Sequence, residues 1–203
     1  MKYGFTACLL SFLLFAAGLS VAQNYPKIEV PVGFSLVNVH PAVDQISSFN
    51  IYGGGGGLVY NLTPFIGIKA DLMGYTQSSK QLFRIEPHFS GYVSGNLFTY
   101  LFGVQLKKHS GKFQPFGEAL FGGAHTNLYT SFRNLGFGSG SNNGFSMEYG
   151  LGLDIPLAKS IQIRPVEVDY LYTHFGSRYY PSTSRSQNNF KYFAGVNFTL
   201  AGK

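Results

Sequence analysis

The 203-residue sequence predicts an all-β fold, an eight-stranded antiparallel up-and-down transmembrane β-barrel. Three observations favour this fold. Apolar and polar residues alternate along stretches of strand length, and this period of two places them on opposite faces of a strand. Aromatic residues make up 17% of the chain but charged residues only 12%, about half the charged fraction of an average soluble domain. Short and long connections alternate between the stretches, which is typical of membrane barrels.

The first 22 residues have the parts of a secretory signal peptide. Lys2 supplies the positive start, residues 8–17 are apolar, and Ser20-Val21-Ala22 is a small-x-small cleavage motif. We expect cleavage between Ala22 and Gln23, so that residues 23–203 form the barrel domain. Cys8, the only cysteine of the chain, would leave with the signal. The exported chain would then have no disulfide, and a closed network of strands would hold the fold together.

In the N-terminal half, four stretches alternate as strands do. They are residues 28–36, 51–60, 66–73 and 98–107. The second contains five consecutive glycines, 53–57, which resemble a phosphate-binding loop but lack the Lys-Ser/Thr pair and the following helix of that motif. We therefore interpret these glycines as a site of close strand packing or strong local curvature.

In the C-terminal half, strands are predicted at residues 113–125, 145–155, 161–175 and 190–200. The clearest alternation is 145–155, FSMEYGLGLDI, in which one face is wholly apolar and the other is Ser146, Glu148, Gly150, Gly152 and Asp154. A soluble sheet buries its apolar face, whereas a small membrane barrel turns that face to lipid and encloses the polar one. The low charge content of the chain favours the second arrangement.

The connections indicate how the barrel is oriented. Residues 61–64, 108–112 and 156–160 are predicted as short turns, and 38–50, 76–96, 126–144 and 176–188 as long loops. An even number of strands places both termini at the short-turn, periplasmic end. Residues 82–93 also alternate, and we interpret them as an ordered extension of the second long loop. A ten-stranded barrel is the alternative.

Most charged residues within the predicted strands fall on the polar, glycine-bearing faces. The predicted strands contain seven of the nine acids, with Lys69, Lys107, Arg164 and Lys191. On the lipid face, Lys or Arg would cost about 2–4 kcal/mol each at mid-membrane, so we expect these groups to face inward. The candidate polar network of the lumen comprises Lys69, Asp71, Glu118, Glu148, Asp154, Arg164, Glu167, Asp169 and Lys191.

Arg164 and Glu167 are out of phase by one residue, with Pro165 between them. Proline within a strand marks an edge or a bulge, and a bulge adds one residue and resets the phase. A bulge here would turn both charged groups inward. Because an eight-stranded barrel is only wide enough for side chains to fill, we interpret the network as ion pairs that keep the barrel closed. A proton or ion path is the alternative.

Four segments resemble the outer-membrane β-barrel family of OmpA/OmpX type. They are FGEALFGGAH at 116–125, GLGLDI at 150–155, IRPVEVDYLYTHF at 163–175 and SQNNFKYFAGVNF at 186–198. The resemblance covers residues 97–200 well and 23–96 more loosely. It implies a small porin-like barrel without catalytic residues, inserted by the barrel-insertion machinery. The chain departs from the family pattern at its end, where Leu200 stands in place of the terminal aromatic residue and Ala201-Gly202-Lys203 follows.

The sequence therefore predicts a non-catalytic protein of the cell outer membrane of a Gram-negative organism. Its role would be structural, or surface recognition through the four long loops. The net charge of +6 comes largely from loops and turns, and the basic pI does not indicate nucleic-acid binding, since no helix or basic cluster is present. Tyrosine and arginine dominate binding hot spots, so the best contact candidates are Arg178, Tyr179, Tyr180 and Arg185.

Expected partners are outer-membrane lipid and lipopolysaccharide, the insertion machinery and an unknown surface ligand, with the chain as a monomer. Three alternatives remain open: a narrow passive pore, a lipid A-modifying enzyme, and a soluble barrel of lipocalin type. The enzyme would rest on His88-Phe89-Ser90 with Glu86, although Gly91 stands where an Asn is expected and no Glu lies on the next strand. The five histidines show no metal-binding spacing, and no cofactor or metal is predicted.

Overall fold

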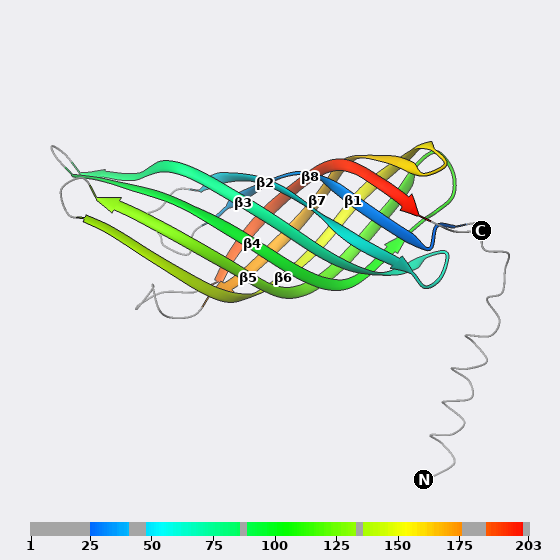
Figure 1. Ribbon diagram of the computed structural model, residues 1–203, viewed down its shortest axis with the longest axis horizontal. Coiled ribbons are helices and arrows are strands. Elements are labelled where there is room, and N and C mark those ends of the chain that lie inside the picture. The colour runs from blue at the N-terminus through cyan, green and yellow to red at the C-terminus, as the bar shows by residue number, and fades with distance from the viewer. Residues whose placement is uncertain (1–24, 41–47, 86–88, 133–135, 176–185, 201–203) are drawn as a thin grey trace, which may run out of the picture.

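The computed structural model describes residues 25–40, 48–85, 89–132, 136–175 and 186–200, with the backbone alone over 78–85, 89–93, 128–132 and 136–140. Eight strands account for nearly all of these residues (Figure 1). They are β1 Ile28–Val39, β2 Phe49–Asn61, β3 Ile66–Ile85, β4 Phe89–Lys107, β5 Gln114–Phe132, β6 Gly136–Ala158, β7 Ile161–Phe175 and β8 Ser186–Leu200. No helix among the described residues is long and apolar enough to cross a bilayer.

The strands form a closed barrel in which each is antiparallel to its neighbours in sequence. β1 also pairs with β8, from Ile28 opposite Leu200 to Asn38 opposite Phe190, which closes the sheet. The predicted up-and-down, eight-stranded architecture is confirmed, and the ten-stranded alternative is wrong. The start of β1 and the end of β8 lie at the end of the barrel that carries the short connections (Figure 1), as predicted.

Two of the predicted long loops are wrong. β3 and β4 remain paired from Ile66 opposite Leu106 to Ile85 opposite Phe89, so strand replaces most of the loop expected at 76–96. β5 and β6 remain paired out to Phe132 opposite Gly136, which replaces most of the loop expected at 126–144. The alternation at 82–93 belongs to these longer strands. Both hairpins project beyond the rest of the barrel at the end away from the termini (Figure 1).

Side chains are sorted by face as in a membrane barrel. Large apolar residues point outward along every strand and are strongly exposed, up to 84% for Phe34 and 73% for Leu151. Inside, polar side chains fill the half nearer the short turns. An apolar cluster that includes Val37, Tyr75 and Phe193 fills the other half. The interior is therefore packed with side chains along the part of the barrel that is described.

Close approach between neighbouring strands, from β8 through β1 and β2 to β3, explains several of the glycines. Gly33 lies opposite Gly55 on β2 and Gly195 on β8. A Cβ atom at Gly33 would collide with the carbonyl oxygen of Ala194, and one at Gly55 with that of Leu72 on β3. Only residues without a side chain fit such contacts. The interpretation of residues 53–57 as a site of close strand packing is confirmed.

Candidate functional site

The candidate site is the charged interior of the barrel. All nine predicted network residues have buried side chains, none more than 7% exposed. Five strands supply them: β3 gives Lys69 and Asp71, β5 gives Glu118, β6 gives Glu148 and Asp154, β7 gives Arg164, Glu167 and Asp169, and β8 gives Lys191. Each reaches the interior because it lies in the inward phase of its strand.

Two lysine ammonium groups bridge five carboxylates at the centre of this network. Lys69 Nζ lies 2.7 Å from Glu118, 3.4 Å from Asp71 and 3.6 Å from Glu167. Lys191 Nζ lies 2.6 Å from Glu148, 3.0 Å from Asp169 and 3.7 Å from Glu167. Every strand from β3 to β8 except β4 is thereby joined to another through an ion pair. A buried ion of this kind needs a partner of opposite charge, because an ion left unpaired bears the full desolvation cost.

Arg164 links this centre to the end near the short turns. Its Nε and Nη2 atoms donate to the two oxygens of Asp154 at 2.8 and 3.0 Å, and Nη1 donates to Glu167 at 2.6 Å. Its guanidinium also lies 4.1 Å from the ring centroid of Phe116. The strand pairing shifts between Arg164 and Glu167, so the bulge predicted at Pro165 is confirmed, and both charged side chains face inward.

Glu29 and Lys107 extend the network beyond the nine candidates. Lys107 Nζ donates to Glu29, to Asp154 at 2.7 Å and to Gln162 at 2.9 Å. Asn197 Nδ2 donates to Glu29 and to Asp154, the latter at 3.0 Å. Five strands, β1, β4, β6, β7 and β8, contribute to this second polar group. These side chains fill the barrel interior just inside the short-turn end.

His109 and Asn61 form the outermost layer of this group, and sequence reasoning missed both. His109 Nε2 lies 2.7 Å from Glu29, and its Nδ1 lies 2.7 Å from the carbonyl oxygen of Pro64. Asn61 Nδ2 donates to Glu29 at 2.8 Å. The available signal is phase: His109 continues the inward series of Gln105 and Lys107 past the end of β4.

Four of the carboxylates are close enough together to be considered as metal ligands. Glu118, Glu148, Glu167 and Asp169 each offer an oxygen within 4.8 Å of the others. The ammonium groups of Lys69 and Lys191 already contact all four. The cations beside these carboxylates are therefore supplied by the protein itself. The arrangement is an ion-pair network that spans the barrel.

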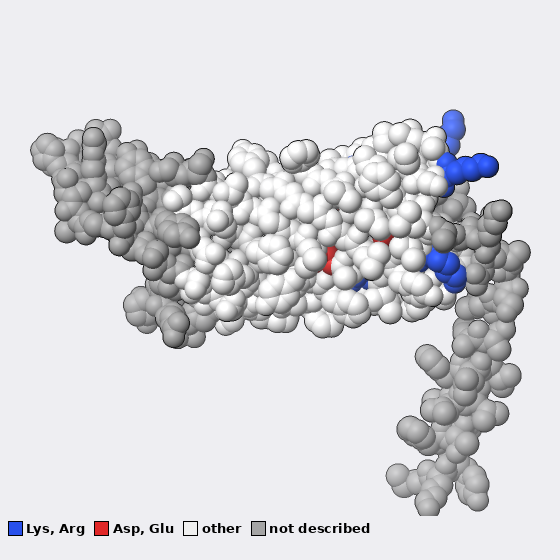
Figure 2. Space-filling model, viewed as in Figure 1, with Lys and Arg blue, Asp and Glu red and all other residues white. Residues whose placement is uncertain are grey.

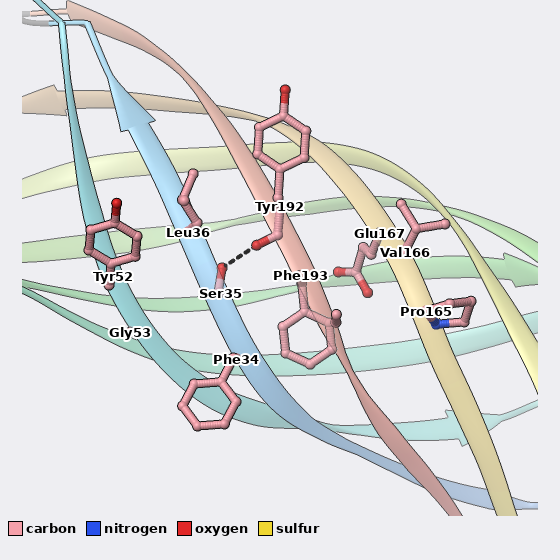
Figure 3. Close-up of a pocket in the computed structure, with 11 residues that line it drawn as sticks. Phe34, Ser35, Leu36, Tyr52, Gly53, Pro165, Val166, Glu167, Tyr192 and Phe193 are labelled. Carbon is pink, nitrogen blue, oxygen red and sulfur yellow. Dashed lines mark hydrogen bonds between the residues drawn. The ribbon is translucent and has the colours of Figure 1, made fainter.

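The outer wall carries a shallow apolar pocket of about 640 Å³ where β1, β2, β7 and β8 adjoin (Figure 3). Phe34, Tyr52 and Tyr192 stand around it, and the β7 bulge at Pro165 forms its edge. Ser35 Oγ donates to the Tyr192 carbonyl oxygen at 2.9 Å behind it. The pocket opens outward among exposed apolar residues, and Glu167 of the charged interior is also among its lining residues.

Several predicted positions lie outside the described residues. They are the cleavage site at Ala22 and Gln23, and the loop contacts Arg178, Tyr179, Tyr180 and Arg185. Glu86 and His88 of the enzyme alternative lie outside them as well. These positions stay predictions.

No protein-family model matches the chain, and no curated protein matches it. Solved structures do match over most of its length. Ail, the attachment invasion locus protein of Yersinia pestis, superposes with a TM-score of 0.57 at 15% identity, covering 87% of this chain and 99% of Ail. Ail in complex with the heparin analogue sucrose octasulfate gives 0.56 at 12% identity, covering 87% and 99%. The outer membrane protein OprG from Pseudomonas aeruginosa gives 0.57 at 13% identity, covering 88% and 97%.

At these identities the likeness is one of fold. Antiparallel pairing closed between β1 and β8, apolar residues outside and charges inside agree with it. The resemblance in sequence to OmpA/OmpX-type proteins points to the same architecture. The chain therefore has the fold of the small outer-membrane proteins, an eight-stranded antiparallel β-barrel of OmpA/OmpX type.

Proposed function

We propose that this protein is a non-catalytic barrel of the outer membrane that presents its long hairpins and connections to the cell exterior for recognition. The observation that carries the proposal is the distribution of polarity. Every acidic residue that the structure describes is buried inside the barrel, while Phe, Tyr, Leu, Ile and Val dominate the outer wall. Figure 2 shows this wall as a broad belt almost free of charge.

The belt supports a membrane location over a soluble one. A monomer in water rarely exposes a contiguous apolar surface larger than a few hundred Å², and a lipocalin-type barrel would enclose an apolar cavity under a polar wall. Here the arrangement is the reverse. Cell fractionation combined with heat-modifiable mobility on gels tests this location directly. Recovery of the protein in the soluble periplasmic fraction, in a form that needs no detergent, would contradict the proposal.

The filled interior supports a closed barrel over a pore. Ion pairs and amides cross the lumen at two levels, around Lys107 near the short turns and around Lys69 and Lys191 further along. An eight-stranded barrel leaves little room beyond such side chains. We therefore expect no stable single-channel current in planar bilayers under conditions that give clear steps with a general porin. Regular ohmic steps would favour the pore instead.

Recognition at the far end is supported by the two projecting hairpins and by the chemistry of the connections. β3–β4 and β5–β6 extend past the other strands (Figure 1), and Arg133, Arg178 and Arg185 belong to connections at that end of the topology. The similar fold of Ail is seen with a heparin analogue. A polysulfated ligand is accordingly the first probe to apply to this chain.

Binding of the refolded protein to immobilised heparin tests the recognition role. We expect binding at low salt that is lost when Arg178, Tyr179, Tyr180 and Arg185 are all replaced by alanine. A variant with two short-turn lysines replaced by glutamine, K108Q/K112Q, is the charge-matched control and should keep it. Equal loss in both variants would show non-specific attraction to a basic protein.

Mass spectrometry of lipid A from cells with and without the protein tests the enzyme alternative, and we expect no difference.

A further inference from the structure

The short-turn end of the barrel carries a rim of lysines, and no exposed acidic residue accompanies them in the part of the chain that the structure describes. Figure 2 shows the basic side chains gathered at this end. Lys108 and Lys112 lie in the β4–β5 turn, Lys159 lies in the β6–β7 turn, and all three are exposed. Lys27 precedes β1 at the same end, and its Nζ lies 4.9 Å from the ring centroid of Tyr25. Three separate segments thus place ammonium groups around one edge.

No acidic side chain among the described residues neutralises the rim. The seven acids among the described residues are all buried in the barrel, and the other two, Asp44 and Glu86, belong to the β1–β2 and β3–β4 connections. Within the described residues, the side chains of Lys108, Lys112 and Lys159 take part in no ion pair or hydrogen bond, whereas the interior lysines each contact two or more carboxylates. The charge of the rim therefore faces outward.

Large apolar side chains lie in or next to the short turns at this end of the barrel. Phe65 in the β2–β3 turn, Phe113 after Lys112 and Leu157 before Lys159 are all more than half exposed. Aromatic and apolar residues at this position mark the boundary between hydrocarbon and headgroups in membrane barrels. If the barrel spans the membrane as proposed above, the lysines lie at the level of the lipid phosphates.

We propose that this lysine rim, comprising Lys27, Lys108, Lys112 and Lys159, binds the headgroups of anionic phospholipids in the leaflet at the short-turn end. The rim matches such lipids in charge and in position, because ammonium groups without an ion-pair partner lie just beyond the apolar belt. Each lysine near an anionic surface favours binding by about fivefold. Charge-assisted contacts to phosphate oxygens need no fixed pocket. The rim selects lipids by charge and fixes the barrel's depth in the bilayer.

Lipid selection by the whole mature chain tests the proposal. The protein is refolded into vesicles of equal phosphatidylcholine and phosphatidylglycerol, released gently, and its retained lipids are counted by native mass spectrometry. We expect the wild type to retain phosphatidylglycerol several-fold over phosphatidylcholine, and the preference to fall in molar salt. The variant K108Q/K112Q/K159Q, which retains only Lys27 of the rim, should lose most of this preference, whereas K108R/K112R/K159R should keep it.

A second triple variant, R133Q/R178Q/R185Q, removes the same charge from connections at the other end and should keep the preference. An equal fall in both glutamine variants would overturn the rim as the site, because net charge alone would then explain the selection. Equal retention of both lipids by a folded wild type would overturn it as well, while leaving the membrane barrel intact. Failure of the wild type to insert into any vesicle would instead overturn the proposed function. Free glycerol phosphate, added at the same concentration as the phosphatidylglycerol, should not compete with this lipid for the rim.

Discussion

Arg164 and Glu167 lie three residues apart on β7, yet both side chains enter the interior and join at 2.6 Å. A regular strand would send one of them to the lipid face. The bulge makes the pairing possible, because Pro165 and Val166 both face outward between them. The same shift keeps Asp154 of β6 within reach of the guanidinium. The one extra residue of the bulge thus determines that the charged side chains on both sides of it face the interior.

Deleting Pro165 should be tolerated for this reason. Without it, Arg164, Val166 and Glu167 would alternate regularly and pair one-to-one with β8, so every charge of β7 would still face inward. Deleting Val168 is the matched control, since it would turn Asp169 and the following residues to the wrong face. We expect the first variant to show folded, heat-modifiable mobility in detergent and the second to remain unfolded. Folding of the Val168 deletion, or failure of the Pro165 deletion, would contradict this account of the bulge.

Removing the Arg164 guanidinium should be among the most damaging single changes. Arg164→Ala would leave Asp154 and Glu167 buried beside fewer cations, and breaking a buried pair from one side costs about 3–5 kcal/mol. Reversible urea unfolding in lipid vesicles measures the change in free energy. The triple variant R164M/D154N/E167Q removes all three charges and should recover much of the loss. If it were as unstable as Arg164→Ala, packing of the side chain on Phe116 would explain the effect in place of charge.

The sequence could indicate these interior residues because alternation is local. Glu148 and Asp154 lie on the polar face of a stretch whose other face is wholly apolar, and both are buried in the structure. His109 and Asn61 could not be assigned in this way, because each stands at a strand end where a turn is equally consistent with the pattern. Their place depends on Glu29, which is distant in sequence but lies 2.7 and 2.8 Å from them.

The length of the hairpins could not be predicted for a different reason. Residues 126–144 are rich in Gly, Ser and Asn, residues that are depleted in strands and enriched in loops. In the structure their backbones continue the β5–β6 ladder out to Phe132 opposite Gly136. Backbone pairing needs no particular side chain, and a ladder already fixed within the barrel extends at little further entropic cost. Composition alone does not reveal that continuation.

Asp169 should contribute little to stability despite its burial. It lies 3.0 Å from Lys191 Nζ, yet neither of its oxygens has a hydrogen bond of good geometry. Five carboxylates share the two central ammonium groups, so one negative charge fewer reduces repulsion. Asp169→Asn is expected to be neutral or stabilising in urea unfolding. Glu118→Gln, which weakens the 2.7 Å contact with Lys69, is the comparison and should be destabilising. Greater damage from Asp169→Asn than from Glu118→Gln would contradict this interpretation of the charge balance.

Gly33 is a position at which one added methyl group should be costly. A Cβ atom there would meet the backbone of Ala194 and Gly195, which cannot move without opening the β1–β8 seam. Overpacking of this kind costs about 1–3 kcal/mol, so Gly33→Ala should lower the free energy of unfolding by that amount. Gly74→Ala is the control, because its Cβ would have only a side-chain atom of Phe98 nearby, at 3.8 Å. We expect it to be neutral or slightly stabilising, since alanine restricts the unfolded chain. Equal effects of the two substitutions in vesicle unfolding experiments would mean that close approach at the seam is not what requires glycine there.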